Sequence, residues 1–263
     1  MARLKKTINN YEDFKDAVLT LSGINLNAYK ERQMKRRIDA LIKKHNCNNY
    51  GDFIGMIQQD KDKYEEFINY LTINVSEFYR NPTQWVTLEK EIIPMLLKNK
   101  KMLTIWSAAC STGDEPYSVA MVLSKFLPLS SIEIIATDID KEILEKARVG
   151  IYSAKSVLNV PIDMKNKFFT VTKDLYHVSS ELKKCVIFKK HNLLKDPYPQ
   201  NVDLIICRNV LIYFTEEAKN EIYTKFSQAL NKDGILFVGS TEQIILAHKY
   251  GFAPHRVFFY KKS

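Results

Sequence analysis

The sequence predicts an α/β fold with a doubly wound parallel sheet, an all-α domain before it and a small antiparallel β-subdomain inserted in it. From residue 102 onward, short apolar runs alternate with helix-periodic segments, which is typical of repeated β-α units. Residues 1–73 have helical periodicity throughout. Residues 150–184 interrupt the alternation with scattered aromatic and turn residues, which predicts a short helix followed by the antiparallel insertion.

The individual elements follow from the same patterns. Helices are expected over residues 11–21, 27–44, 50–58, 63–71, 85–97, 117–126, 141–149 and 216–230, and strands over 102–109, 132–137, 186–190, 202–207, 234–238 and 257–261. Asn81-Pro82 ends any preceding helix, so the mixed polar and aromatic stretch before it is either a functional loop or a linker. The predicted domains are 1–73, all-helical; 74–101, a linker and entry helix; and 102–263, the α/β domain with its insertion at about 150–184.

Composition limits the partners and the compartment. The chain has 263 residues, 46% of them hydrophobic, which is ample for a packed core, and a net charge of +9, which favours an acidic partner such as nucleic acid, an anionic membrane or an acidic protein. The four cysteines form no C-x-x-C pair and are predicted to be thiols of a reducing cytosol. No secretory signal and no apolar run of about 20 residues is visible, so a cytoplasmic protein without membrane insertion is expected.

The stretch 102–121, MLTIWSAACSTGDEPYSVAM, predicts a buried strand, a turn and a helix start. Pro116 suits a first helical position, and Asp114 and Glu115 suit the positive end of a helix dipole. The turn has one glycine and presents carboxylates, whereas a phosphate site favours several glycines and a lysine. A site for a cationic or hydroxyl-bearing ligand and a plain acidic helix cap are both open at this point.

Polar residues follow several predicted strands, whose carboxyl ends should meet at one crevice. Asp138 directly follows the second strand, where an acid can accept hydrogen bonds from ribose hydroxyls, and Asp140 is the competing candidate or a helix cap. Asn192 follows the third strand, and Arg208 and Asn209 follow the fourth. With no Ser-His-Asp spacing, metal cluster or Walker loop in the sequence, ligand binding and positioning are the expected chemistry.

The predicted helix over 27–44 is strongly basic. Between Lys30 and Lys44 it carries seven basic residues and two acidic ones. Its apolar positions share one face, so the basic residues form either a solvated face or a docking surface.

Together these segments resemble the CheR-type chemotaxis receptor methyltransferases, which use S-adenosylmethionine to methylate receptor glutamates. The resemblance rests on NVSEFYRN (74–81), IWSAACSTGDEPYS (105–118), ATDID (136–140), HNLL (191–194), CRNVLIYF (207–214) and LFVGSTEQ (236–243). It covers nearly the whole chain, and one departure is Asp114, where the family commonly has glutamate. The resemblance implies a Rossmann-like methyltransferase domain with an inserted β-subdomain behind an all-α domain.

The resemblance also implies the site. The residues expected to bind the cofactor are Asn74, Ser76, Arg80, Glu115, Asp138, Asn192, Leu193, Arg208 and Asn209. Arg80 and Tyr213 are expected nearest the transferred methyl group, as the catalytic residues. Arg32, Lys35, Arg36 and Arg37 are expected to dock the acidic helical bundle of the receptor. S-adenosylhomocysteine would be the product, and no metal is expected.

The cofactor is a sulfonium cation without phosphate, which is consistent with carboxylates in the turn. The substrate glutamate, with a reference pKa of about 4.3, is already ionised at neutral pH and needs no general base. Some family members also bind a receptor C-terminal pentapeptide through a Gly-containing loop of the β-subdomain. The corresponding segment of this chain, residues 171–178, is short and lacks glycine, so no dependence on that peptide is expected.

Two other functions are considered. The net charge allows a methyltransferase of nucleic acid, but residues 208–211 lack the N-P-P-Y-type motif of amino-group methylation, and Cys207 lies too early, within a strand, for cytosine C5 chemistry. A non-catalytic, cofactor-binding regulatory module is the third possibility. The presence of both Arg80 and Tyr213 disfavours it.

Overall fold

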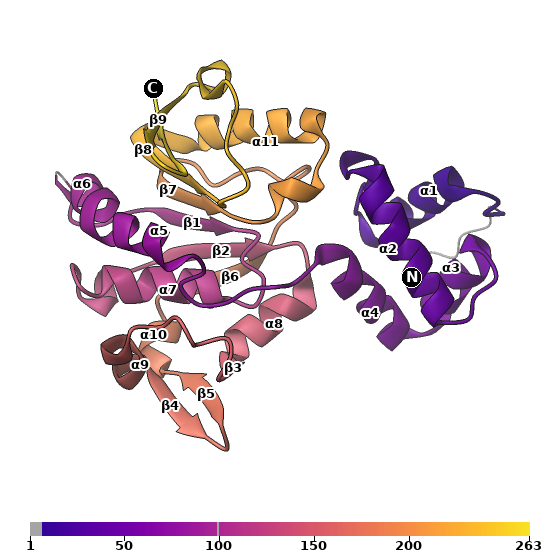
Figure 1. Ribbon diagram of the computed structural model, residues 1–263, viewed down its shortest axis with the longest axis horizontal. Helices are drawn as coiled ribbons and strands as arrows, with labels where there is room; N and C mark the ends of the chain where they lie inside the picture. Colours follow the sequence, from indigo (N-terminus) through magenta and orange to yellow (C-terminus); the bar gives the residue numbers. More distant parts are fainter. Residues whose placement is uncertain (1–6, 99) are drawn as a thin grey trace. The chain divides into compact units, whose positions relative to one another are not determined.

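The computed structural model describes residues 7–98 and 100–263, which fall into two units (Figure 1). The first contains the described residues up to Asn74 together with Tyr213–Lys219. The second contains Val75–Ile212 and Asn220–Ser263. Within these described residues, no helix is both long and apolar enough to cross a membrane.

The first unit is helical. Its elements are α1 (Tyr11–Ser22), the 3-10 turn η1 (Leu26–Ala28), α2 (Glu31–Lys44), α3 (Tyr50–Gln59) and α4 (Lys61–Thr72). The side chains of Asn10, Asn49 and Asp60 cap α1, α3 and α4 by accepting from backbone amides of the first turn. The helix predicted over 27–44 begins at Glu31, because the preceding residues form η1 and an extended stretch. In that stretch Tyr29 makes an antiparallel bridge with Phe214.

The second unit is built on a seven-stranded sheet in the order β6-β2-β1-β7-β8-β10-β9. The strands are β1 (Ile105–Ala108), β2 (Ile134–Asp138), β6 (Val186–Lys190), β7 (Val202–Cys207), β8 (Leu230–Val238), β9 (Phe252–Arg256) and β10 (Phe259–Lys262). The first five strands of this order pair in parallel, and β10 is antiparallel to both of its neighbours. The strand order reverses between β1 and β7, which makes their carboxyl ends the switch point where such folds bind ligands. The predicted doubly wound sheet is confirmed.

Helices cover both faces of this sheet. The helical elements from Pro82 onward are α5 (Pro82–Thr87), the π turn η2 (Leu88–Ile92), α6 (Ile93–Leu97), α7 (Asp114–Leu123), η3 (Leu129–Ser131), α8 (Lys141–Val149), α9 (Ile162–Phe168), α10 (Ser180–Lys183), η4 (Leu211–Tyr213), α11 (Glu216–Ala229) and η5 (Ala247–Tyr250). Adjacent residues of β1 point to opposite faces. Trp106 packs on Phe226 of α11 at 5.5 Å between ring centroids, whereas Ser107 bonds Glu115 of α7. Helices α11 and α7 therefore lie on opposite faces of the central strand.

The predicted insertion is a three-stranded antiparallel sheet. Its strands are β3 (Ile151–Ser153), β4 (Phe169–Thr172) and β5 (Leu175–Val178), in the order β3-β5-β4. Phe78 packs edge-on against Tyr152 and Phe169, at 4.7 and 5.3 Å between ring centroids, and its amide donates to the carbonyl of Ser156 at 3.1 Å. The insertion is therefore fixed to the segment that enters the second unit.

Candidate functional site

The turn between β1 and α7 lies at the switch point and contains left-handed backbone torsions. Ala109, Ser111 and Gly113 have φ of 59°, 49° and 87°. Such torsions are unfavourable for residues with a β-carbon and occur where the surrounding structure enforces them, often at functional sites. A β-carbon on Gly113 would lie 2.9 Å from the β-carbon of Ala147 in α8, so glycine is also needed for close packing.

Asp138 ends β2 beside this turn, and its carboxylate is buried. Its Oδ2 accepts from the Ser111 amide at 2.9 Å, and its Oδ1 accepts from the Asp140 amide at 3.0 Å. Burial raises the pKa of Asp138 to about 6, although both amide donors lower it. Each carboxylate oxygen can accept a further hydrogen bond, so Asp138 can bind hydroxyl groups of a ligand.

Asp140, the competing candidate, caps helix α8. Its Oδ1 accepts from the amides of Glu142 and Ile143 at 3.0 and 3.3 Å. This arrangement is the usual use of an aspartate at a helix N-cap. Of the two acids, Asp138 is therefore the better candidate for a ligand contact.

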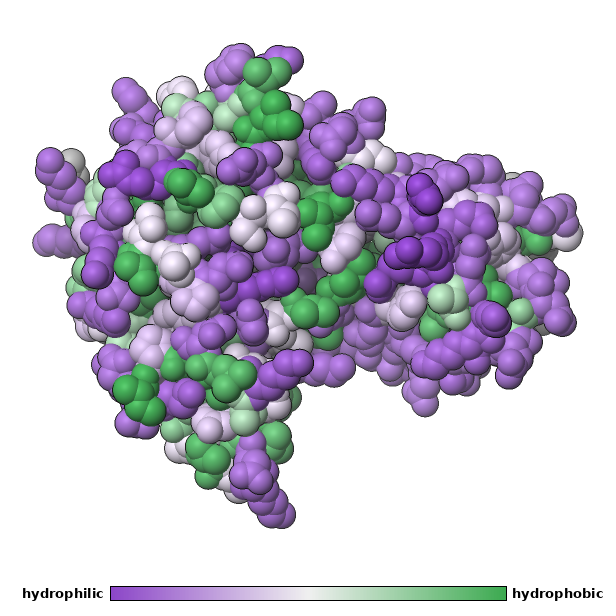
Figure 2. Space-filling view, in the orientation of Figure 1, coloured by the Kyte–Doolittle hydropathy of each residue, from purple (hydrophilic) through white to green (hydrophobic). Residues whose placement is uncertain are grey.

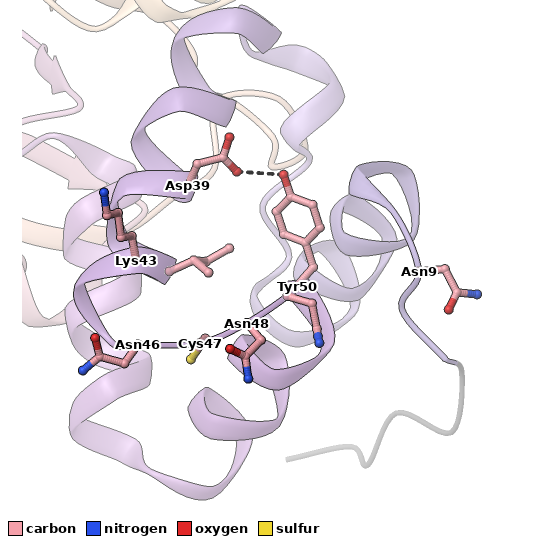
Figure 3. A pocket seen from close by; sticks show the side chains of 9 residues that line it. Asn9, Asp39, Lys43, Asn46, Cys47, Asn48 and Tyr50 are labelled. Atoms are coloured by element: carbon pink, nitrogen blue, oxygen red, sulfur yellow. Dashed lines mark hydrogen bonds between the residues drawn. The ribbon is translucent and has the colours of Figure 1, made fainter.

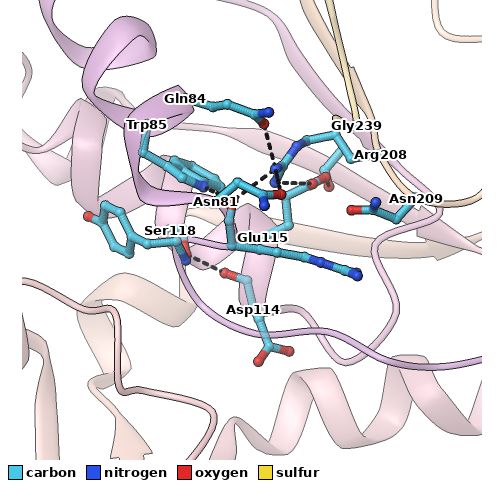
Figure 4. Close-up of polar contacts among 12 residues, drawn as sticks. Asn81, Gln84, Trp85, Asp114, Glu115, Ser118, Arg208, Asn209 and Gly239 are labelled. Carbon is cyan, nitrogen blue, oxygen red and sulfur yellow. Dashed lines mark hydrogen bonds and ion pairs between the residues drawn. The ribbon is translucent and has the colours of Figure 1, made fainter. Parts of the chain in front are cut away.

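Glu115, in the first turn of α7, forms a buried network with Arg208, the residue that follows β7 (Figure 4). The Glu115 side chain is 13% exposed, and its Oε2 lies 3.7 Å from Nη1 of Arg208. Its Oε1 accepts from the Ser107 hydroxyl at 2.8 Å. Burial raises the pKa of Glu115, and the nearby Arg208 lowers it. Because charge-assisted hydrogen bonds are about 2.7–2.9 Å long, a separation of 3.7 Å leaves the Glu115 charge only partly balanced.

The Arg208 guanidinium is directed at the segment that carries Arg80. Its Nη2 donates to the carbonyl of Arg80 at 2.8 Å, to Oδ1 of Asn81 at 3.1 Å and to Oε1 of Gln84 at 2.8 Å. It also lies over the ring of Phe237, with 4.7 Å between the guanidinium carbon and the ring centroid. Arg208 therefore holds the Arg80 segment in place, whether or not it also reaches a cofactor.

The Arg80 segment is also tied to α7. The Tyr79 amide donates to the Ser118 hydroxyl at 3.1 Å, and that hydroxyl donates to the carbonyl of Asp114 at 2.7 Å (Figure 4). Tyr79 and Asn81 have φ of 50° and 60°. The half-buried Arg80 side chain donates from Nη1 to the carbonyl of Val75 at 3.3 Å. The segment predicted to be either a functional loop or a linker is thus a strained, well-anchored loop.

Asp114, the departure from the family pattern, is nearly fully buried in this part of the site. Its carboxylate accepts from the hydroxyls of Thr112 and Ser76. Burial raises the pKa of Asp114 to about 6. Ser76, predicted as a cofactor residue, therefore bonds an acid of the site.

The loops after β6 and β7 supply the remaining predicted residues of the second unit. Oδ1 of Asn192 accepts from the Leu194 amide at 3.0 Å, and the carbonyl of buried Leu193 accepts from the Tyr198 hydroxyl at 2.7 Å. Asn209 has φ of 61°. Asn209 comes directly after Arg208, just beyond the end of β7. The loops thus place these residues at the same edge of the sheet as Asp138.

Sequence reasoning did not single out Glu242, which is 5% exposed. Its carboxylate accepts hydrogen bonds from the amides of Asn209, Leu211, Ile212 and Gly239. The residue lies within LFVGSTEQ, one of the segments that carry the family resemblance. Glu242 lies four residues beyond Val238, the last residue of β8, so its position did not mark it as a residue directly after a strand.

Asn74 and Tyr213 belong to the first unit. Nδ2 of Asn74 donates to the Thr72 hydroxyl at 2.8 Å, and the carbonyl of the half-buried Tyr213 accepts from the Lys30 amide at 2.8 Å. Their roles near the cofactor and the methyl group stay predictions.

The four basic residues predicted to dock a receptor lie on α2 and have different environments. Nη2 of Arg37 donates to the backbone carbonyl of Tyr70 at 2.5 Å. The guanidinium carbon of Arg37 lies over the Tyr70 ring, 4.5 Å from the ring centroid. Lys35 bonds Asp39 at 3.0 Å. Arg32 and Arg36 are exposed, and among the described residues neither forms an ion pair. The visible surface of this unit is mainly hydrophilic (Figure 2).

The first unit also has a hollow of about 610 Å³ (Figure 3). Two of its polar groups are already paired, because the Tyr50 hydroxyl donates to Asp39 at 2.7 Å. Burial raises the pKa of the Cys47 thiol, so this cysteine is not activated as a nucleophile. None of the residues predicted to bind the cofactor lines the hollow; its lining consists of Asn9, Asp39, Ile42, Lys43, Asn46, Cys47, Asn48, Asn49 and Tyr50.

The charge at the switch point suits a cationic ligand. Four largely buried carboxylates lie around the carboxyl ends of the parallel strands: Asp114, Glu115, Asp138 and Glu242. Glu115 is the one of these that lies 3.7 Å from the buried guanidinium of Arg208. Ser111 has a buried hydroxyl oxygen without a hydrogen-bond partner among the described residues. Excess negative charge and free hydrogen-bonding capacity fit the sulfonium and hydroxyls of S-adenosylmethionine. In the part of the chain that the structure describes, no group of three or more His, Cys, Asp or Glu side chains could hold a metal ion.

The sheet order and the acidic switch point define a Rossmann-like methyltransferase domain preceded by an all-α domain. The family model for the CheR methyltransferase SAM-binding domain matches residues 74–258, and the model for the CheR methyltransferase all-alpha domain matches residues 9–72. The chain belongs to the CheR methyltransferase family.

Relatives named chemotaxis protein methyltransferase resemble it along most of their length. The protein from Listeria monocytogenes is 41% identical over 242 residues, which cover 92% of each chain. The protein from Borreliella burgdorferi is 34% identical, over 84% of this chain and 83% of that one. The protein from Escherichia coli is 32% identical, over 91% of this chain and 86% of that one.

Proposed function

We propose that this protein transfers a methyl group from S-adenosylmethionine to glutamate side chains of chemotaxis receptors, giving methyl esters and S-adenosylhomocysteine. The observation that carries this proposal is the family match along nearly the whole chain, over a site rich in buried carboxylates. The proteins named chemotaxis protein methyltransferase support the receptor as substrate. A cytoplasmic location follows from such a substrate.

When bound, the cofactor supplies a methyl group activated by a positively charged sulfur. Asp138 would accept hydrogen bonds from its ribose hydroxyls, and Glu115 would provide negative potential. Arg80 would hold the substrate carboxylate by charge-assisted hydrogen bonds, and the Arg208 contacts to its segment would fix its position. Since the substrate is already ionised, alignment and exclusion of water would supply the catalysis.

The exposed face of α2 would dock the receptor. Arg32, Arg36 and Lys43 are exposed and lie within about 40° of one another around a helix with 100° per residue. Their summed field would attract a bundle rich in glutamate. Arg37 and Lys35 were also predicted for this surface, but their bonds to Tyr70 and Asp39 favour a structural role in the first unit.

The β-subdomain would work without a receptor tail peptide. The turn between β4 and β5 consists of Lys173 and Asp174, both with positive φ, 49° and 61°, so it is a tight two-residue hairpin turn. Such a turn leaves no extended Gly-containing loop for a peptide. Titration of the chain with an aromatic C-terminal pentapeptide should show no tight binding, and micromolar binding would contradict this part of the proposal.

Three substrates separate the proposal from its alternatives. Tritiated S-adenosylmethionine should label the cytoplasmic fragment of a chemotaxis receptor, and RNA and DNA should stay unlabelled. A receptor fragment with glutamine at its methylation positions is the matched control and should stay unlabelled too. Labelled nucleic acid would favour the nucleic-acid methyltransferase, and binding of the cofactor with no labelled macromolecule would favour a regulatory module.

A further inference from the structure

The carboxylate of Glu242 joins two loops at the carboxyl ends of β7 and β8. Its Oε2 accepts from the amides of Asn209 and Gly239 at 2.6 and 2.9 Å. Its Oε1 accepts from the amides of Leu211 and Ile212 at 2.8 and 3.3 Å. Both carboxylate oxygens thus accept hydrogen bonds from the short segment 209–212 of the neighbouring loop.

This segment cannot satisfy its own amides. Asn209 has a left-handed backbone, with φ of 61°, and η4 begins at Leu211, so the amides at the start of that turn have no intrahelical partner. Four amide donors at one place require an acceptor with several lone pairs. A carboxylate meets this need, whereas a glutamine would turn its NH₂ group toward two of the donors.

The backbone at Gly239 is shaped around the same carboxylate. A β-carbon there would lie 2.5 Å from Oε2 of Glu242 and 2.9 Å from the amide nitrogen of Asn209. The close approach of the two loops therefore requires glycine at 239. Figure 4 shows Gly239 and Asn209 beside Arg208 at this edge of the sheet.

We propose that Glu242 is a positioning residue of the cofactor site: it holds Asn209 in the strained conformation in which Asn209 meets the cofactor. This inference rests on the proposed function, because that function assigns Asn209 to the cofactor. A positioning residue of this kind needs no ligand contact of its own. The effect of Glu242 on binding passes through Asn209.

The first test uses ligand-free protein. Native-state hydrogen exchange should show slowly exchanging amides at Leu211 and Ile212, and Glu242→Gln should accelerate both at least tenfold. Amides of β1 should keep their protection in the variant, which shows that the fold is intact. Unchanged exchange at Leu211 and Ile212 would overturn the proposal, and this result does not depend on any cofactor.

The second test is a double-mutant cycle in calorimetric titrations with S-adenosylmethionine. Glu242→Gln and Asn209→Ala should each weaken binding about tenfold, and the double variant should be no weaker than Glu242→Gln alone. Glu242→Gln combined with Asp138→Ala should instead lose the product of the two factors, because Asp138 lies on another strand. Additive losses for the Asn209 pair would contradict the positioning role. Wild-type protein that fails to bind would count against the proposed function instead.

Discussion

The two units of this chain use charge in opposite ways. The second unit buries Asp114, Glu115, Asp138 and Glu242 at the carboxyl ends of its parallel strands, with one buried arginine, Arg208, beside Glu115. The first unit exposes cations along α2 and bonds others to its own backbone and acids. Burying a carboxylate is costly unless hydrogen bonds or a ligand compensate, whereas an exposed arginine costs little.

The difference indicates what each unit is able to recognise. A buried negative site interacts at short range and in low dielectric, which suits one small cation. An exposed basic face acts through a field that salt screens within about 10 Å at 0.1 M, which suits encounter with an acidic macromolecule. Mutations in the two units should therefore alter different constants.

The largest effect is expected from Arg80→Ala. Methylation should fall by a factor of about 10² or more, because the substrate carboxylate loses its charged donor. The melting temperature should stay within a few degrees, since among the described residues the Arg80 side chain makes one hydrogen bond, to the Val75 carbonyl. Steady-state kinetics and thermal melts check this, with the surface variant Arg256→Ala as control. Near-normal turnover in Arg80→Ala would exclude the assigned role.

Asp138→Ala should weaken S-adenosylmethionine binding by about 1.5–3 kcal/mol, the range for hydrogen bonds to a charged group. Asp140, two residues after Asp138 along the chain, provides a matched control. Because Asp140 caps α8, Asp140→Ala should cost about 1 kcal/mol of folding free energy and leave the dissociation constant nearly unchanged. Calorimetry and denaturant melts on both variants test the contrast. Equal losses of affinity in the two variants would remove the distinction between them.

Acidification should weaken cofactor binding. The pKa values of Asp114 and Asp138 are raised to about 6, so both groups are ionised at pH 8 and largely protonated at pH 5. A cation binds the ionised form better, so affinity should be constant above about pH 7 and fall about tenfold per group by pH 5. Titrations with S-adenosylhomocysteine, whose sulfur is uncharged, should show a smaller change. An equal pH dependence for both ligands would contradict the electrostatic interpretation.

The smallest effect is expected from the first unit. Arg32→Glu combined with Arg36→Glu should raise KM for the receptor several-fold at low salt, remove most of its salt dependence and leave cofactor affinity unchanged. Lys101→Glu combined with Lys232→Glu makes the same net change at two exposed positions, Lys101 before β1 and Lys232 near the start of β8, and should have little effect. Wild-type KM in the α2 variant, or an equal rise in the control, would leave α2 without a docking role.

Periodicity was sufficient for the sheet and most helices, because buried runs and amphipathic faces are local properties of the sequence. Periodicity did not predict β9, because Pro254 and the basic residues of this segment are untypical of a strand. Such residues are tolerated here because β9 is an edge strand. Periodicity placed the start of α2 four residues early, since the bridge of Tyr29 to Phe214 depends on contacts far along the chain.

The candidate site was predicted less completely than the fold. Asp138 and the turn at Gly113 could be found from their positions after strands. Glu242 could not, because its four amide partners come from two loops that meet only in the folded chain. Sequence also could not distinguish Arg36, which is exposed, from Arg37, which is bonded to Tyr70.

The most direct measurement of the proposed function is the chemical stability of the transferred methyl group. Receptor fragment labelled by this protein with tritiated S-adenosylmethionine should be treated with mild alkali, and volatile methanol should be collected. A glutamate methyl ester hydrolyses under these conditions, so nearly all label should leave the receptor as methanol. Label that remains on the protein after alkali would show N-methylation or another linkage and would contradict glutamate esterification.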